Sequence, residues 1–175
     1  FAALKKDGTV VAWGQSGYGG SGVPSDLSNV QAIYSTGSAF AALKEDGSVA
    51  AWGSSENGGS VPSGLSNVQA IYSCERAFAA LKQDGSVAAW GHSAYGGSGV
   101  PSDLSNVQAI YSTRVAFAAL KQDGSVVAWG DGRDGGSGVP SDLSNVQAIY
   151  STEFAFAALR QNGTVAAWGK SDSGG

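Results

Sequence analysis

The chain has 175 residues, of which 42% are hydrophobic and 14% are charged, and it contains 27 glycines but no methionine. This apolar content suffices for a packed core, and the glycine content favours tight turns over long helices, so we expect an all-β chain. Ten basic against fourteen acidic residues give a formal net charge of −4, which argues against nucleic acid or a membrane surface as partner. No apolar run approaches the roughly 20 residues of a membrane-spanning helix, so membrane insertion is not expected.

The motif Phe-Ala-Ala-Leu occurs five times along the chain, at steps of 39, 38, 39 and 39 residues. A fixed period of this length indicates a repeat architecture, in which each unit packs on its sequence neighbours. We therefore describe residues 1–175 as a single repeat domain. Its units are 1–39, 40–77, 78–116 and 117–155, followed by a half unit at 156–175.

Three short strands, each bounded by turn residues, can be assigned in every full repeat. In one example they span residues 67–73, 77–82 and 86–91. Asp84-Gly85 between the last two predicts an antiparallel hairpin, because such a turn needs a positive φ that glycine adopts without a Cβ clash. The Gly/Ser-rich segment 96–105, which contains a proline, then predicts the crossing to the next unit.

The strands do not alternate cleanly between apolar and polar residues, since residues 78–81 and 87–90 are apolar throughout. This pattern is expected of a small sheet that is covered on both faces. Units stacked face to face satisfy it, with the recurring tryptophans filling the gap between neighbours. Stacking also leaves an apolar face at each end of the array, so we expect ring closure or assembly with further units.

Residues 77–91, together with the Asn-Val-Gln-Ala-Ile-Tyr-Ser string before them, resemble the repeat of the regulator of chromosome condensation family. The resemblance covers essentially the whole chain. The unit length is more similar to that of bacterial relatives, such as beta-lactamase inhibitory protein II, than to the longer blades of the eukaryotic founder of the family. It implies tandem three-stranded antiparallel blades of about 39 residues, forming a β-propeller or part of one, and a role in protein recognition. About four and a half units are compatible with a window of a longer array, a small ring or an open superhelix.

Two departures from the family pattern recur. Alanine stands before the Phe-Ala-Ala-Leu motif at positions 39, 77, 116 and 155, where the family often has histidine. The tail after Trp-Gly reads Gly-Gly-Ser-Gly instead of Gly-Gln-Leu-Gly.

Two loops of each repeat carry most of the differences between units: the turn between the first and second strands, and the segment after Trp-Gly. Because the strands run up, down and up, both loops fall at one rim and the Asp-Gly tips fall at the other. The varied rim mixes arginines with aromatic residues, a composition that protein interfaces favour, although neutral variation of exposed loops would give the same pattern. The candidate partner-binding residues are Tyr18, Glu75, Arg76, His92, Tyr95, Arg114, Asp131, Arg133, Glu153 and Phe154.

No catalytic, metal or cofactor site is predicted. His92 is the only histidine, so neither a metal cluster nor a histidine-based triad can be assembled from these residues. Cys74, the only cysteine, is interpreted as a replacement for the threonine of the other units. Asp131 and Asp134 make a weak calcium motif, because Arg133 intervenes and no terminal glutamate follows.

We therefore expect a non-catalytic protein–protein interaction module or scaffold that binds through the varied rim. The alternative is a structural subunit of a larger complex or an extracellular filament, because near-identical units suit an array whose length matters more than its details. A carbohydrate-binding module is a weaker alternative, suggested by Tyr18 and Tyr95 beside serine and asparagine. The expected partner is another protein or neighbouring copies of the chain itself.

Overall fold

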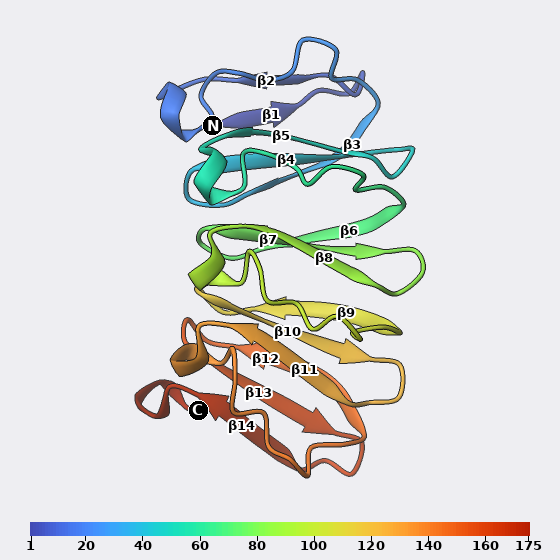
Figure 1. The fold of residues 1–175 in the computed structure, drawn as a ribbon, viewed down its shortest axis with the longest axis vertical. Helices are drawn as coiled ribbons and strands as arrows, with labels where there is room; N and C mark the ends of the chain where they lie inside the picture. The colour runs from blue at the N-terminus through green and yellow to red at the C-terminus, as the bar shows by residue number, and fades with distance from the viewer.

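Five antiparallel β-sheets are stacked along the long axis of the molecule (Figure 1). The computed structural model describes the whole chain, residues 1–175. The first sheet contains β1 (Ala2–Leu4) and β2 (Val10–Ala12). The other four sheets contain three strands each: β3 (Val30–Ser35), β4 (Ala39–Lys44) and β5 (Val49–Gly53); β6 (Val68–Ser73), β7 (Ala77–Lys82) and β8 (Val87–Gly91); β9 (Val107–Ser112), β10 (Ala116–Lys121) and β11 (Val126–Gly130); β12 (Val146–Ser151), β13 (Ala155–Arg160) and β14 (Val165–Gly169).

Each three-stranded sheet is a simple meander with the middle strand paired to both neighbours, as the sequence predicts. The tips between the second and third strands are tight turns. In the third sheet the Asp84 carboxylate accepts hydrogen bonds from the amide and the hydroxyl of Ser86, at 2.9 and 2.6 Å. Gly85 follows with a φ of +77°. Asn162 replaces the aspartate in the last tip and accepts the same two bonds from Thr164, so this position forms a turn and does not require an acid.

A β-bulge in the first strand of every three-stranded sheet decides which residues face the neighbouring sheet. In β6 the register with β7 shifts between Val68 and Ala70, and Gln69 is exposed. As a result Val68 and Ile71, three residues apart, are both buried against the preceding sheet. The bulge explains why this strand lacks the two-residue alternation of an undistorted strand.

One aromatic pair joins each three-stranded sheet to the sheet before it. In the fourth sheet Phe117 and Trp129 stack with ring centroids 5.4 Å apart, and both are almost completely buried. The Trp129 indole N–H donates a hydrogen bond to the carbonyl oxygen of Gly96, 3.1 Å away, which belongs to the preceding sheet's loop. Gly96 also leaves space for the Phe117 ring, since a Cβ there would lie 2.8 Å from Cδ2. All four contacts between sheets repeat this arrangement.

Backbone hydrogen bonds add a second link between sheets at the hairpin tips. The amide of Val107, the first residue of β9, donates to the carbonyl oxygen of Gly85 in the preceding tip, 3.0 Å away. Asn106, the residue before, has a φ of +55°, a conformation that asparagine tolerates better than most residues. Its own carbonyl oxygen accepts from the Gln122 amide at the tip of its own sheet, so the start of each first strand is held from both sides.

Short 3-10 turns follow the Trp-Gly pairs, where the sequence analysis expected only loops. They are η1 (Ser16–Tyr18), η2 (Ser55–Asn57), η3 (Ser93–Tyr95), η4 (Gly132–Asp134) and η5 (Ser171–Ser173). Each ends on a glycine in the left-handed region. None of these turns has the length or apolar character needed to cross a membrane.

The stack is open, and the two chain termini lie at its opposite ends (Figure 1). Of the three arrangements considered from the sequence, a small closed ring is therefore wrong for residues 1–175. The expected apolar ends are present: Phe1 is 80% exposed and Trp13 is 51% exposed, whereas the equivalent Trp129 inside the stack is 3% exposed. At the other end Tyr150 and Val165 are exposed.

We predict that Gly96→Ala lowers the free energy of unfolding by about 1–3 kcal/mol more than Gly99→Ala does, because only the first change overpacks a buried ring. The two glycines have φ values of +84° and +79°, so alanine incurs similar backbone strain at each. The added methyl group overlaps Phe117 at Gly96, but nothing lies within 4 Å at Gly99. Urea denaturation measures the difference, and equal losses would contradict this account of the contact between sheets.

Candidate protein-interaction surface

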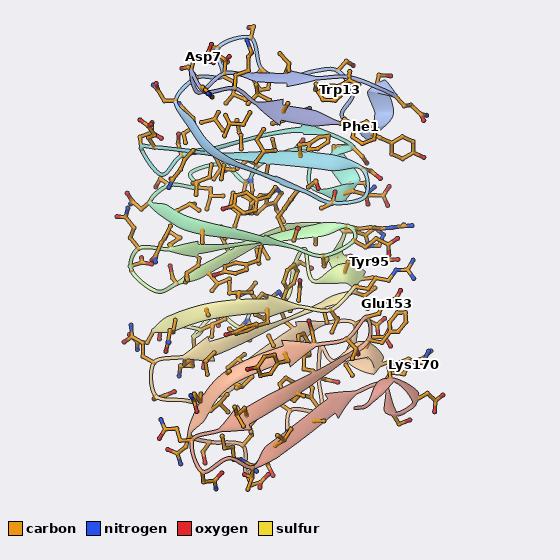
Figure 2. The ribbon with its side chains drawn as sticks, turned by 180° about the vertical axis from the view of Figure 1, so that it is seen from behind. Phe1, Asp7, Trp13, Tyr95, Glu153 and Lys170 are labelled. Carbon is orange, nitrogen blue, oxygen red and sulfur yellow. The ribbon has the colours of Figure 1, made fainter.

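Two loops of each three-stranded sheet lie together at one rim of the stack, which we call the loop rim. They are the turn between the first and second strands and the 3-10 turn after Trp-Gly. In the fourth sheet Thr113 Oγ1 donates to the carbonyl oxygen of Asp134, 3.1 Å away, and so joins the two loops. Thr36 and Thr152 make the same bond in their own sheets. In Figure 2, Tyr95, Glu153 and Lys170 lie at this rim and Asp7 lies at the opposite one, which we call the hairpin rim.

Cys74 stands where the other sheets have threonine. Its Sγ atom lies 3.2 Å from the carbonyl oxygen of Tyr95, so the thiol replaces the threonine hydroxyl as the link between the two loops. The side chain is buried, and this burial raises the pKa of the thiol. A buried, protonated thiol is a poor nucleophile, which agrees with the interpretation of Cys74 as a structural replacement.

A ladder of backbone hydrogen bonds runs along the loop rim from sheet to sheet. The Gly37 amide donates to the carbonyl oxygen of Glu75 at 2.7 Å, the Glu75 amide to that of Arg114 at 3.0 Å, and the Arg114 amide to that of Glu153 at 2.8 Å. These four residues occupy the same position in successive first turns. The ladder therefore fixes the spacing at which the rim presents its variable side chains.

The same four positions carry an ion-pair ladder wherever they have charged side chains. Arg114 donates two hydrogen bonds to the Glu75 carboxylate, at 2.6 and 3.2 Å, and one to Glu153, at 3.1 Å. The hydrogen bonds from Arg114 lower the pKa of the Glu75 carboxyl. The paired carboxylates raise the pKa of Arg114 in turn. Three of the residues nominated from the sequence thus bind one another, and the group carries one net negative charge.

Cation and aromatic side chains from the two loops also meet at the loop rim. The Arg76 guanidinium lies over the ring of Tyr95, 5.1 Å from its centroid, and the Lys170 ammonium lies over Phe154 at 5.0 Å. Phe154 is therefore only partly exposed. Both contacts hold an aromatic ring in a defined orientation at the surface, partly covered by a cation.

The remaining nominated residues do not form one cluster. His92 packs edge-on against Tyr95 with ring centroids 5.0 Å apart, and its Nε2 lies 3.4 Å from Glu56 of the preceding sheet. The Asp131 carboxylate accepts from the Arg133 amide at 2.9 Å, which caps η4. Tyr18 is 53% exposed on the first sheet's loop. The nominated residues therefore form a row along the stack, with members on the first, third, fourth and fifth sheets and none on the second.

The hairpin rim contains two similar polar hollows that the sequence analysis did not anticipate. One, of about 300 Å³, lies between the third and fourth sheets, and the other, of about 260 Å³, lies between the fourth and fifth. Glutamines from the bulged first strands and from the hairpin tips line both: Gln69, Gln83, Gln108 and Gln122 in the first, Gln108, Gln122, Gln147 and Gln161 in the second. The signal in the sequence was the recurrence of glutamine at one position of every first strand.

The chain matches no protein-family model, and the search of curated proteins found no similar sequence. Several solved structures share its fold. The ectodomain of the receptor kinase CR4 from Physcomitrella patens superposes with a TM-score of 0.60 and 18% identity, over 81% of this chain and 39% of that one. Prp20p from Saccharomyces cerevisiae superposes with a TM-score of 0.59 and 19% identity, over 84% of this chain and 46% of that one. Human WBSCR16 superposes with a TM-score of 0.60 and 19% identity, over 97% of this chain and 59% of that one.

These structures, among them yeast RCC1 (Prp20), show that the fold is that of propeller blades of the RCC1 type. The resemblance recognised from the Ala-Phe-Ala-Ala-Leu and Trp-Gly strings is therefore confirmed at the level of fold. The present chain spans between 39% and 59% of the length of the three structures described above.

We predict that Arg114→Gln raises the pKa of Glu75 toward its usual value, because the carboxylate loses its charged donor. In the unchanged protein the folded-state pKa is lowered, so the pair stabilises the fold at neutral pH, and this contribution is lost as the pH falls through that pKa. Carboxyl-carbon NMR titration measures the shift. Arg133→Gln, at an exposed arginine without an ion pair, is the control and should leave Glu75 unchanged. An unchanged pKa in the Arg114 variant would contradict the assignment.

Proposed function

We propose that this chain is a non-catalytic protein-interaction module and that its partner protein binds along the loop rim. In this proposal residues 1–175 act as one repeat domain. The observation that carries it is the location of the differences between repeats. Strands, tips and contacts between sheets repeat almost unchanged, whereas the loop rim changes its side chains from sheet to sheet.

The chemistry of the loop rim supports a protein partner. Arginine and aromatic residues are enriched at the energetic centres of protein interfaces, and Arg76 over Tyr95 and Lys170 over Phe154 present both kinds on a fixed backbone ladder. A preordered surface loses little conformational entropy on binding. The net charge of −4 favours a protein over a nucleic acid.

The known protein partners of one solved structure with this fold also support the proposal. Prp20p is described by its binding to Gsp1p and histones, and in another structure it is bound to Kap60. Those partners belong to Prp20p, and with identities of 18–19% only the use of the fold for protein recognition is carried over here. The carbohydrate alternative gains no support, because Tyr18 and Tyr95 belong to 3-10 turns two sheets apart.

The test compares three immobilised proteins as baits for an extract of the source cells: the unchanged chain, a loop-rim variant and a hairpin-rim variant. The loop-rim variant carries Arg76→Ala and Phe154→Ala, and the matched control carries Gln83→Ala and Gln122→Ala. We predict that the partner is retained by the unchanged chain and by the control. With the purified partner, calorimetry should show at least about a tenfold weaker affinity for the loop-rim variant, as expected when anchor residues are truncated.

Equal losses in both variants, or a loss confined to the hairpin-rim control, would overturn the assignment of the loop rim. Circular dichroism and the urea midpoint of each variant exclude unfolding as the cause. The four substituted side chains lie at the surface, so both variants are expected to fold.

A further inference from the structure

Glutamine side chains form a row along the hairpin rim of the third, fourth and fifth sheets. Three come from the bulged positions of the first strands and three from the tips between the second and third strands: Gln69, Gln108 and Gln147, and Gln83, Gln122 and Gln161. All of them are exposed. The two polar hollows of this rim share Gln108 and Gln122, so they adjoin and together form what we call the glutamine groove.

The backbone holds both kinds of glutamine at fixed places. The bulge takes Gln108 out of the register between β9 and β10 and leaves its side chain exposed. The backbone amide of Gln122 donates to the carbonyl oxygen of Asn106, 2.9 Å away, and the tip glutamines of the third and fifth sheets make the same bond in their own sheets. The groove therefore repeats one pair of side chains from sheet to sheet.

The side-chain amides of the groove are free to bind a ligand. In the three tips the aspartate or asparagine binds the serine or threonine two residues later, and no side-chain hydrogen bond of the chain involves a glutamine. Each glutamine amide has two N–H donors and a carbonyl acceptor. The groove thus presents donors and acceptors side by side, without competition from neighbouring side chains.

The two hollows contain no unpaired charge. Lys82 pairs with Asp84 at 3.7 Å in the first, and Lys121 pairs with Asp123 at 3.5 Å in the second. A polymer of phosphate groups would therefore find no free cation.

The hollows also lack the apolar surface that a protein partner would need. A single valine lines each of them, Val107 in the first and Val146 in the second, whereas protein interfaces depend on large buried anchors at an apolar centre. Amides together with compensated charges favour a neutral ligand rich in hydroxyl groups, because a hydroxyl group both donates and accepts hydrogen bonds.

We propose that the glutamine groove binds a neutral, linear polysaccharide. Equivalent hollows suit a ligand of equivalent units, and successive sugar units present hydroxyl groups in the same arrangement. The volumes of about 300 and 260 Å³ lie near the lower end of those of small-molecule sites, roughly 300–1,000 Å³, so each hollow takes a short segment of the polymer. One polymer that occupies both hollows binds more tightly than a ligand that fills only one.

This site is separate from the surface proposed for the protein partner. It lies on the hairpin rim and uses neither Tyr18 nor Tyr95, the residues that suggested carbohydrate binding in the sequence and that belong to η1 and η3. The groove can therefore bind its ligand whether or not the loop rim binds a protein, and each proposal can fail without the other.

The test is electrophoresis of the 175-residue chain in native gels that contain a soluble neutral polysaccharide: dextran, laminarin, xyloglucan or galactomannan, one in each gel. We expect at least one of them to retard the unchanged chain. A variant with Gln108→Ala and Gln122→Ala loses the amides that both hollows share, so its dissociation constant should rise at least about tenfold. Neither side chain makes a hydrogen bond within the chain, so the variant is expected to fold, which circular dichroism checks.

Gln15→Ala is the matched control, since Gln15 is an exposed glutamine at the start of η1, outside the groove. It should be retarded like the unchanged chain. Failure of all four polysaccharides to retard the chain would overturn the proposal, as would equal losses in the double variant and the control. Retardation by poly-L-proline, an extended neutral polypeptide, in place of every polysaccharide would assign the groove to a peptide and contradict the proposal.

Oligosaccharides cut from the retained polysaccharide test whether both hollows take part. In calorimetry the affinity should rise with the number of sugar units until the ligand spans both hollows, and then level off. The same affinity at every length would be decisive against a groove made of two equivalent hollows.

Discussion

The whole fold depends on one contact, made four times: a phenylalanine and a tryptophan of one sheet packed on the loop glycine of the sheet before it. The glycine contributes twice, since it leaves room for the phenylalanine ring and its carbonyl oxygen satisfies the buried indole N–H. A sheet of three short strands cannot bury enough surface alone, so its stability comes from its neighbours. This requirement keeps strands and Trp-Gly pairs nearly identical along the chain.

The same constraint explains where the repeats are free to differ. The loop rim is held by backbone hydrogen bonds and by one threonine or cysteine in each three-stranded sheet, so its other side chains do not need to be conserved between repeats. Side chains such as Arg76, Arg114 and Phe154 vary on a backbone whose spacing does not. A fixed backbone with variable side chains is a suitable basis for recognition, as in other repeat proteins with extended binding surfaces.

Much of the fold was predictable because its signals are local. Asp84-Gly85 predicts a tip, and five copies of one motif predict five sheets. The 3-10 turns and the bulge at Gln69 were not predicted, since both depend on backbone geometry that a period-two or period-3.6 pattern does not encode. The pairing of Arg114 with Glu75 and Glu153 was also missed, because residues 39 apart become neighbours only when the sheets stack. The loop rim could be located from strand direction, but the contacts along it could not.

Hydrogen exchange of the monomeric chain, at high dilution, tests most directly whether contacts between sheets hold the structure. If they do, the amides of β7 and β10, whose sheets are covered on both faces, exchange most slowly, and those of β1, β2 and β14 exchange fastest. This gradient should follow position in the stack, because strand sequences and hydrogen-bond registers are nearly the same in every sheet. Equal protection of the end and central sheets would contradict the account.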